Sequence, residues 1–193
     1  VRVQARQWLW ATGGYAINAP FANNDRPGVF AARAVGRLLE QHRIRAGTRV
    51  VILDCAATRA YARRLATALV AAGAEVEQRD LALARAVRGG TQVESLLLSN
   101  DERLDADLIA VAAVPSPASE GPRQQGCRVT LDPSRGGFAV DATDGRTSVP
   151  GVWAAGDVCG YLGVDRALAD GERIAHALVH AHAQQPADPR GGA

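Results

Sequence analysis

Thr147-Ser-Val-Pro-Gly-Val-Trp-Ala-Ala-Gly-Asp157 is the most informative stretch of this 193-residue sequence. The apolar run 152–155 predicts a buried core strand, which Gly156 ends with a turn. A glycine at the end of a strand lets the backbone approach phosphate oxygens, and the Asp157 carboxylate can accept hydrogen bonds from sugar hydroxyls. A simple glycine turn with a capping aspartate is the structural alternative.

A long helix is predicted directly after this turn, from Val164 to about Ala183. Gly163 and Val164 begin it, so its N-terminal amides could face a ring oxygen on which negative charge gathers. The residues predicted on its inner face are Leu168, Ile174, Ala175 and Leu178.

The chain upstream of this motif predicts alternating strands and helices. Residues 6–14 predict a short buried strand that ends in a glycine turn, and residues 29–42 predict a helix with Pro27 near its start. The apolar strand 49–54, a helix 59–72 that Thr58 could cap and Gly73 closes, and the strand 74–79 form a βαβ unit.

Further strands are predicted nearer the C-terminus. Residues 91–98 and 108–114 predict two of them, and Pro115-Ser-Pro117 predicts a crossing between lobes. Residues 121–146 predict a connector or a small antiparallel sheet, with hairpin-like runs at 127–131 and 137–140.

The composition favours a globular, cytoplasmic protein. Hydrophobic residues make up 47% of the chain, the net charge is +2, and the 22 basic residues are all arginine and interleaved with acids. No basic stripe indicates nucleic acid or a membrane surface, and no apolar run approaches the roughly 20 residues of a bilayer-spanning helix. The start at Val1 and the lack of methionine indicate a fragment or a non-standard start codon.

Neither the cysteines nor the histidines predict a metal or redox centre. The cysteines are scattered and never in CxxC spacing, so we interpret them as reduced packing thiols. The i, i+4 histidine pair of the last helix has no carboxylate or cysteine to complete a metal site. The residues concerned are Cys55, Cys127, Cys159, His42, His176, His180 and His182.

TSVPGVWAAGD resembles the second flavin-binding signature of the pyridine nucleotide-disulfide oxidoreductase superfamily. Ala11-Thr-Gly13 resembles the ATG turn of that superfamily, where the chain passes between the flavin lobe and the inserted nucleotide lobe. Residues 21–29 are similar to the alpha subunit of heterotetrameric sarcosine oxidase. The runs similar to opine oxidase, amino-acid dehydrogenase and hydrogen cyanide synthase subunits are 125–129, 136–138 and 145–147.

This resemblance implies FAD as the cofactor, with NAD as the alternative because the sarcosine oxidase alpha subunit is expected to hold NAD in the corresponding lobe. Asp157 would hold the ribityl chain and pyrophosphate, Gly156 would admit the backbone, and Thr12 with Gly13 would line the edge of the site. The cofactor-binding residues that follow are Thr12, Gly13, Gly156, Asp157, Gly163 and Val164. No catalytic residue and no metal ligand is predicted.

Two departures from the family pattern qualify these implications. The family's first βαβ, whose GxGxxG turn cradles the adenosine pyrophosphate, would precede Val1. The turn after the strand 49–54 reads Asp54-Cys-Ala-Ala-Thr-Arg-Ala60 and contains no glycine, so methyl groups and a carboxylate would obstruct a pyrophosphate. We therefore interpret the inserted lobe as a packing module rather than an NAD(P)H site.

The predicted fold is α/β: a truncated two-dinucleotide-binding-domain flavoprotein fold, with a parallel Rossmann-like sheet and helices on both faces. Residues 1–28 would end the FAD-type lobe, 29–117 would form a degenerate inserted NAD-type lobe, and 118–183 would return to the FAD-type lobe. Residues 184–193 would be a disordered tail.

The leading functional hypothesis is a segment or subunit of a flavin-dependent oxidoreductase that oxidises an amine or amino-acid derivative by hydride transfer to flavin. A partner subunit carrying the GxGxxG lobe or the catalytic flavin is expected. One alternative is a catalytically silent remnant or interaction subunit that binds no cofactor alone. Another is a free-standing NAD(P)-binding module built on residues 50–80.

Overall fold

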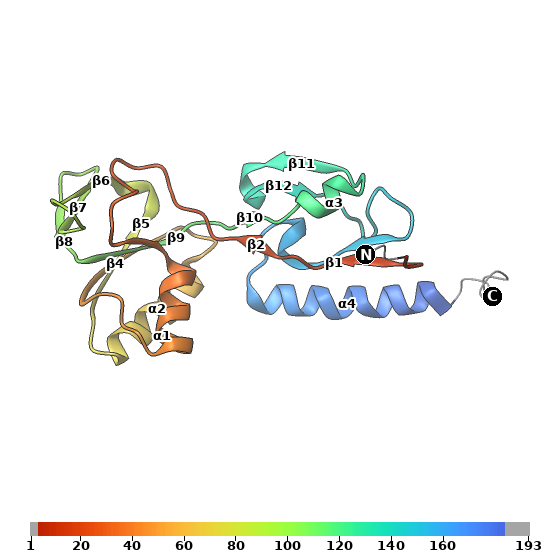
Figure 1. Cartoon of the computed structure of the whole chain (residues 1–193), viewed down its shortest axis with the longest axis horizontal. Helices are drawn as coiled ribbons and strands as arrows, with labels where there is room; N and C mark the ends of the chain where they lie inside the picture. Colours follow the sequence, from red (N-terminus) through yellow and green to blue (C-terminus); the bar gives the residue numbers. More distant parts are fainter. Residues whose placement is uncertain (1–3, 184–193) are drawn as a thin grey trace. The chain divides into compact units, whose positions relative to one another are not determined.

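The computed structural model of the protein describes residues 4–183, which form two compact units (Figure 1). Unit 1 combines the described residues up to Tyr15 with those from Ser116 onward, and unit 2 is Ala16–Pro115. The predicted disordered tail, residues 184–193, lies outside the described residues.

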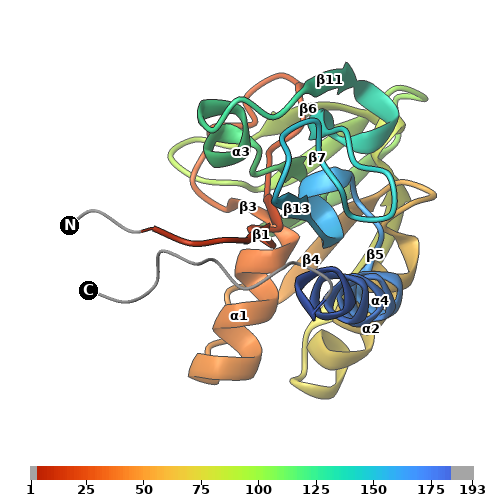
Figure 2. The ribbon, with the colours of Figure 1, turned by 90° about the vertical axis from the view of Figure 1, so that its right-hand side faces the viewer.

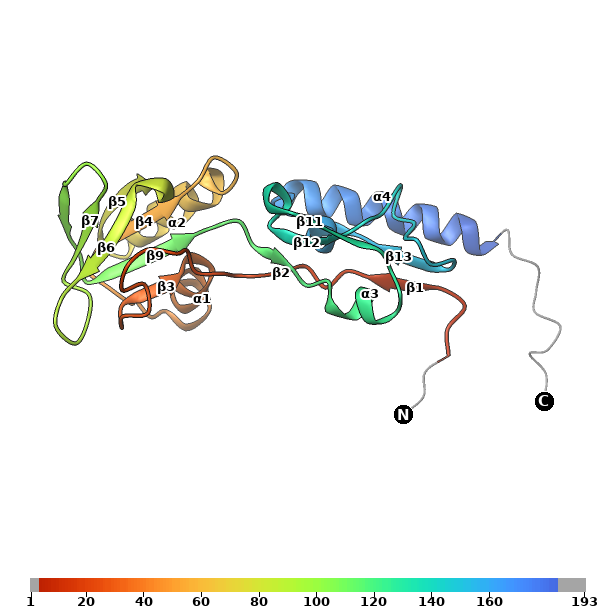
Figure 3. The ribbon, with the colours of Figure 1, turned by 90° about the horizontal axis from the view of Figure 1, so that it is seen from above.

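Unit 2 is built on a parallel sheet in the order β3-β9-β4-β5, which Figure 3 shows from above. An antiparallel sheet in the order β6-β7-β8 accompanies it. The helices and strands are β3 Val29–Ala31, α1 Ala32–His42, β4 Arg49–Asp54, α2 Arg59–Ala71, β5 Glu75–Asp80, β6 Ala84–Arg88, β7 Ser95–Leu98, β8 Arg103–Asp105 and β9 Leu108–Ala112.

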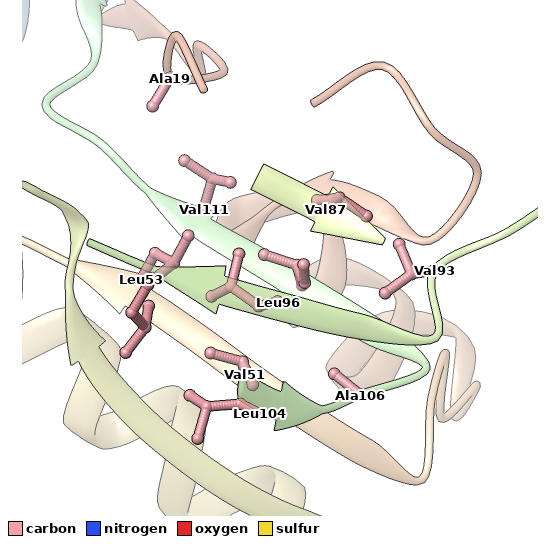
Figure 4. Close-up of a cluster of buried hydrophobic side chains, with 11 residues drawn as sticks. Ala19, Val51, Leu53, Val87, Val93, Leu96, Leu104, Ala106 and Val111 are labelled. Carbon is pink, nitrogen blue, oxygen red and sulfur yellow. The ribbon is translucent and has the colours of Figure 1, made fainter. Parts of the chain in front are cut away.

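Successive side chains of β4 point to opposite faces of the sheet, and this alternation explains why unit 2 has three layers. Val50 and Ile52 pack with Ala62 and Leu65 of α2 on one face of the sheet. Val51 and Leu53 of β4 point the other way, toward the antiparallel strands, because successive side chains of a strand face opposite sides of the sheet. The second cluster, drawn in Figure 4, consists of Ala19, Val51, Leu53, Val87, Val93, Leu96, Leu98, Leu104, Ala106, Ile109 and Val111.

Unit 1 has a smaller parallel sheet, β1 with β13, in which Trp8 aligns with Val152 and Trp10 with Ala154. The other pairs are the hairpin β11-β12 and the short ladder β2-β10, both antiparallel. The helices and strands are β1 Trp8–Trp10, β2 Gly14–Tyr15, β10 Ser116–Pro117, α3 Glu120–Gln124, β11 Val129–Asp132, β12 Gly137–Val140, β13 Val152–Ala154 and α4 Val164–Ala183.

The two-stranded sheet of unit 1 is also covered on both faces. Val152 and Ala154 pack with Val140 on the side of the β11-β12 hairpin. Trp153 packs against Ile174 of α4 on the other side. Figures 1 and 2 both show β13 between the hairpin and α4.

The α/β class and the parallel sheet are confirmed, but the prediction of helices on both faces is wrong in unit 2. Both α1 and α2 contribute to the same buried cluster, and the opposite face carries β6, β7 and β8. Of these strands, β6 and β8 are short and expose charged residues, such as Arg103 and Asp105 of β8, so their apolar pattern is weak.

The helix predicted over residues 29–42 begins later, at Ala32. Val29, Phe30 and Ala31 form β3 instead, because their backbone pairs in parallel with β9. The helical spacing of apolar residues continues across the junction between β3 and α1, and the predicted helix therefore began too early. Pro27 lies before the strand and does not start the helix.

The buried face of α4 differs from the prediction although its bounds agree. Ile174 is 2% exposed and Leu178 packs beside it, as expected. Leu168, however, is 69% exposed, and Ala175 is exposed as well. Four apolar residues at helical spacing therefore do not share one covered face.

The first unit boundary lies after Tyr15 rather than after Gly28. Ala19 and Phe21 belong to the core of unit 2, and Ala22 forms an isolated bridge with Ala86 of β6. The second boundary, before Ser116, falls in the predicted crossing 115–117. Within residues 4–183, no helix is long and apolar enough to cross a membrane.

Candidate functional site

Two glycine turns lie side by side at the carboxyl ends of β1 and β13. The strands run in parallel, Trp10 aligns with Ala154, and the Ala155 N–H donates to the Trp10 carbonyl over 2.9 Å. Thr12 and Gly13 therefore follow one strand at the same sheet edge where Gly156 follows the other. Ligands of open α/β sheets bind at this edge.

The first turn places Gly13 in the left-handed region, with φ +70°. A Cβ at this position would meet nothing within 4 Å. The turn is tied to the returning chain, because the Thr12 hydroxyl donates to the Ala118 carbonyl over 2.8 Å and the Ala118 N–H donates to the Gly13 carbonyl over 2.9 Å.

The second turn, Gly156–Cys159, is a single turn of 3₁₀-helix that begins with Gly156 at φ +73°. Here too a Cβ would meet nothing within 4 Å. Asp157 is the second residue of this turn, and its Oδ1 accepts a hydrogen bond of 3.0 Å from the Leu162 N–H. This bond holds the loop that leads from Asp157 to α4.

Gly163 and Val164 lie at the start of α4, as predicted. Gly163 has φ +80°, and its carbonyl accepts the Ala167 N–H over 2.9 Å. Val164, the first residue of the helix, is 56% exposed. The Asp157–Leu162 hydrogen bond thus connects the turn to the N-terminal end of this helix.

Sequence reasoning missed Asp170, which lies on α4 and reaches back to the second turn. Its Oδ2 accepts the Gly156 N–H over 2.9 Å, and its Oδ1 accepts from Arg173 over 2.8 Å. The one sequence signal is its position four residues before buried Ile174, where a carboxylate interrupts the apolar face. A peptide donor of the turn is therefore occupied by the chain itself.

Arg135 is a second residue that the sequence did not single out. Its Nε donates to the Cys159 carbonyl over 2.9 Å, and its Nη2 donates to the same carbonyl and, over 3.0 Å, to the Val140 carbonyl. A Cβ at Gly160 would lie 3.0 Å from the Arg135 side chain. Arg135 therefore fastens the hairpin to the loop after Asp157.

Burial raises the pKa of the Cys159 thiol to about 11, and the nearby Asp170 carboxylate adds to this effect. The group is consequently a neutral thiol near pH 7, which disfavours attack by sulfur. Cys55, Cys127 and Cys159 are all unbridged. Among residues 4–183, no group of three or more His, Cys, Asp or Glu side chains could hold a metal ion.

The glycine-free turn after β4 is filled by contacts within unit 2. Asp54 is 3% exposed, and its oxygens accept from Arg59 Nε over 3.0 Å and from Gln78 Nε2 over 3.3 Å. Buried Thr58 donates its hydroxyl to the Ala112 carbonyl of β9 and makes no side-chain cap bond to α2. These contacts support the interpretation of a packing module.

A polar pocket of ≈ 710 Å³ lies elsewhere in unit 1. It includes none of the residues of the two glycine turns. Arg146, one of its lining residues, stacks on Trp153 with its guanidinium 4.4 Å from the ring centroid. The residues that line the pocket are Arg128, Arg135, Asp141, Ala142, Thr143, Asp144, Arg146, Thr147 and Ser148.

Comparison with known proteins gives a match to the family described as pyridine nucleotide-disulphide oxidoreductase, over residues 28–184. The sequence is also 28% identical to sarcosine oxidase subunit alpha of Corynebacterium sp. (strain P-1). That alignment covers 93% of this chain and 21% of the relative.

Solved structures show the same fold. L-proline dehydrogenase from P. horikoshii matches with a TM-score of 0.71 and 19% identity, over 90% of this chain and 34% of that one. A ferredoxin reductase from Rhodopseudomonas palustris matches with a TM-score of 0.62 and 19% identity, over 98% and 55% of the two chains. The chain thus spans about a fifth of the curated relative and between a third and just over half of these structures.

Proposed function

Because the chain belongs to the pyridine nucleotide-disulphide oxidoreductase family, we propose that unit 1 forms one wall of the dinucleotide site of a flavin-dependent oxidoreductase. The observation that carries this proposal is the pair of open glycine turns at the adjoining ends of β1 and β13. With Asp157 beside them, these turns offer close backbone approach and a carboxylate at one sheet edge.

The residues at this edge fit a bound dinucleotide. Gly13 and Gly156 leave open the space that a Cβ would take, so a pyrophosphate could approach the backbone there. Asp157 would accept hydrogen bonds from ribityl hydroxyls, and Thr12 would line the edge. The N-terminal amides of α4, at Gly163 and Val164, would face the pyrimidine oxygen of the ring.

FAD, with NAD as the alternative, would supply the capacity to accept a hydride from a substrate carbon bonded to nitrogen. The chain's own part is to hold and orient: Asp170 fixes the Gly156 peptide and Arg135 fixes the loop after Asp157. Similarity to sarcosine oxidase subunit alpha supports an amine or amino-acid derivative as the substrate class. A partner subunit with a GxGxxG lobe would supply the rest of the site.

A second candidate is a catalytically silent or purely interacting subunit. It is favoured by the engagement of the turn's own polar groups, since the Gly156 N–H donates to Asp170 and Asp157 Oδ1 accepts from Leu162. A nucleotide competing for these groups would have to replace existing bonds, which lowers its net gain.

Titration of the purified chain with FAD and with NAD separates the two candidates, with the visible spectrum and flavin fluorescence as readouts. We expect FAD binding that Asp157→Ala weakens by about ten- to a hundredfold, because a charge-assisted hydrogen bond is worth roughly 1.5–3 kcal/mol. Asp165→Ala, in the first turn of α4, is the matched control and should bind like the original chain. The titration is run alone and with a GxGxxG-bearing partner.

Three outcomes would overturn parts of this proposal. Unchanged FAD binding by Asp157→Ala would remove the assigned site. Failure to bind FAD in both settings would favour the silent subunit. A chain that binds NAD but not FAD would reassign the cofactor.

A further inference from the structure

The polar pocket of unit 1 has the size of a ligand site but plays no part in the proposed dinucleotide site. Its volume of ≈ 710 Å³ lies within the range of about 300–1,000 Å³ that is usual for small-molecule sites. Such sites are mostly apolar, whereas Ala142 is the one apolar residue of this lining. A molecule that fills the pocket must therefore be hydrophilic, and the charges of the lining decide its sign.

The charges of the lining favour an anion. The lining contains three arginines and two aspartates. Asp141 lies 3.7 Å from Arg135 and 3.9 Å from Arg128, and Asp144 Oδ1 accepts a hydrogen bond of 3.1 Å from Arg173 of α4. Both carboxylates therefore have cationic neighbours within the protein, and the positive charge of the lining is not fully compensated.

The three arginines of the lining have different roles. Arg135 donates to the carbonyls of Cys159 and Val140, so its hydrogen bonds serve the fold. Within the part of the chain that the structure describes, the side chains of Arg128 and Arg146 donate no hydrogen bond. The 3.9 Å between Arg128 Nε and Asp141 Oδ2 is too long for one. Two guanidinium groups of the lining therefore keep their donors for a ligand.

Pairing across a strand edge holds Arg146 in position. Arg146 and Trp153 form an antiparallel bridge, with main-chain hydrogen bonds of 2.8 and 3.1 Å on either side of it. Side chains of such a pair lie close together, and the guanidinium stacks on the ring of Trp153, which is 2% exposed. Stacking occupies the flat face of a guanidinium and leaves the N–H groups at its edge to bind an anion.

The turn that carries Arg146 is fixed as well. Asp144 and Gly145 have φ +49° and +79°, as in a type I′ turn, and Thr143 and Arg146 exchange main-chain hydrogen bonds of 3.0 and 2.9 Å. A Cβ at Gly145 would lie 2.7 Å from Ile174 of α4, so the turn packs closely on this helix. A wall that is already ordered lowers the entropic cost of binding a ligand.

Arg128 belongs to the other wall, at the start of the β11-β12 hairpin. Its main-chain N–H donates to Ser148 Oγ over 2.7 Å, and its carbonyl accepts the Asp141 N–H over 3.0 Å. These bonds join the hairpin to the loop after Arg146. The backbone that carries Arg128 is therefore anchored, while its side chain is 73% exposed.

We propose that this pocket binds a small hydrophilic anion whose carboxylate or phosphate oxygens accept hydrogen bonds from Arg128 and Arg146. The planar fork of a guanidinium matches the oxygens of both groups, and such charge-assisted bonds are among the strong ones in proteins. Arg135 is a positioning residue that holds the hairpin wall in place. The inference does not depend on the proposed function, because the pocket includes none of the residues of the two glycine turns.

The test titrates the full chain by calorimetry with malonate and, separately, with inorganic phosphate, at constant ionic strength. We expect at least one of the two anions to bind, with slower hydrogen exchange in residues 141–148. The arm that binds more tightly identifies the preferred group. Malonamide, the neutral analogue of malonate, should not bind. Absence of binding by both anions, or equal binding of malonamide and malonate, would overturn the proposal.

Variants assign the binding to the two arginines. Arg128→Gln and Arg146→Gln should each weaken the binding about tenfold or more, because each removes charge-assisted hydrogen bonds. Arg123→Gln is the matched control, since Arg123 is an exposed arginine on α3 that lies outside the pocket lining, and its affinity should be unchanged. Equal losses in all three variants would indicate general attraction to a basic chain and overturn the site.

A check of folding accompanies the variants. Arg146→Gln removes the stacking on Trp153, so its far-UV circular dichroism and its urea midpoint are compared with those of the original chain. Arg128→Gln carries the test independently, because this exposed side chain makes no hydrogen bond to the described residues. Unchanged affinity of folded Arg128→Gln would remove Arg128 from the site.

Competition distinguishes this pocket from the dinucleotide site. The affinity for the anion should be the same with and without saturating FAD, and FAD binding should be the same in Arg128→Gln as in the original chain. Displacement of the anion by FAD would make the pocket part of the dinucleotide site and overturn the proposal. If the chain binds no FAD, the anion titrations still decide the pocket, and only the proposed function fails.

Discussion

Gly156 occupies its left-handed conformation in open surroundings. Its φ is +73°, and a Cβ at this position would meet nothing within 4 Å. An alanine here would therefore destabilise the fold through its unfavourable left-handed backbone conformation, not through a steric clash. Gly171 provides a natural contrast, because it lies inside α4 and a Cβ there would also meet nothing.

Gly156→Ala should lower the stability of unit 1 by about 1–2 kcal/mol, the usual cost of a left-handed conformation for a residue with a Cβ. Gly171→Ala should raise stability by about 0.5–1 kcal/mol, because alanine is the better helix former. Urea unfolding followed by tryptophan fluorescence measures both changes. Shifts of the same sign for the two variants would contradict this account.

Cys159 should make the stability of unit 1 depend on pH in alkaline solution. Burial raises the thiol pKa from 9.0 to about 11, so the folded state holds its proton more tightly than the unfolded state. Below pH 9 the thiol is protonated in both states. As the pH rises from 9 to 11 the unfolded state loses its proton first, and stability falls.

The expected loss over this range is on the order of 2 kcal/mol, since each pKa unit corresponds to about 1.4 kcal/mol. Cys159→Ala should reduce the loss in a series of urea titrations from pH 8 to pH 11. Cys55→Ala, a cysteine of unit 2, is the control and should leave the loss in place. An identical decline for the two variants would remove Cys159 as its source.

At this scale the sequence predicted the residues whose chemistry is visible in a local motif. Gly13, Gly156 and Asp157 could be predicted because a glycine turn directly after an apolar strand is visible within a few neighbouring residues. Asp170 and Arg135 were missed because they act through contacts with residues 14 and 24 positions away, respectively, and no local pattern encodes such a contact.

Among the elements, α2 illustrates how a polar side chain joins a helix to a sheet. Thr58 precedes α2, is 3% exposed, and donates its hydroxyl to the Ala112 carbonyl of β9. Thr58, which was predicted to cap α2, therefore connects the start of α2 to β9 instead. Thr67, in the middle of α2, makes a local bond of 3.1 Å to the Arg63 carbonyl and is exposed.

Thr58→Val should destabilise unit 2 by about 1–3 kcal/mol, because it leaves the buried Ala112 carbonyl with one partner fewer. Thr67→Val should change stability by less than about 0.5 kcal/mol, as is usual for exposed positions. Far-UV circular dichroism in urea and hydrogen exchange of β4 amides give the measurement. Similar losses for the two threonines would show that the β9 contact contributes little.

The strands and helices with a strong local sequence pattern were the easiest to predict. The bounds of β4, α2 and α4 agree closely with the sequence patterns, and the β11-β12 hairpin is confirmed. Errors fall where pairing across the sheet overrides local pattern, as in β3, or where strands are short and half exposed, as in β6 and β8. The exposure of Leu168 and Val179 on α4 could not be predicted, because periodicity does not show which apolar residues of a helix the fold buries.

On the scale of the whole molecule, the two units have separate cores of unequal completeness. Unit 2 combines a four-stranded parallel sheet with covered faces, whereas the parallel sheet of unit 1 has two strands. Small sheets are marginal when they stand alone. The three tryptophans, Trp8, Trp10 and Trp153, all lie in unit 1.

The unfolding transition followed by tryptophan fluorescence, which reports on unit 1, should therefore have its midpoint at a lower urea concentration than the transition followed by far-UV circular dichroism, to which both units contribute. Hydrogen exchange should agree, with β1 and β13 amides exchanging at lower urea than those of β4. Coincident transitions in the isolated chain would mean that the units unfold as one.

The pairing of β2 with β10 has a consequence for the order of folding. Gln7 and Trp153, joined by a hydrogen bond of 2.8 Å, are 146 positions apart, so bringing β1 and β13 together from a random coil would close a very long loop. Unit 2 is continuous in sequence and can collapse first during synthesis. Once β2 and β10 join the two ends of that folded insert, β1 searches for β13 across a far shorter span.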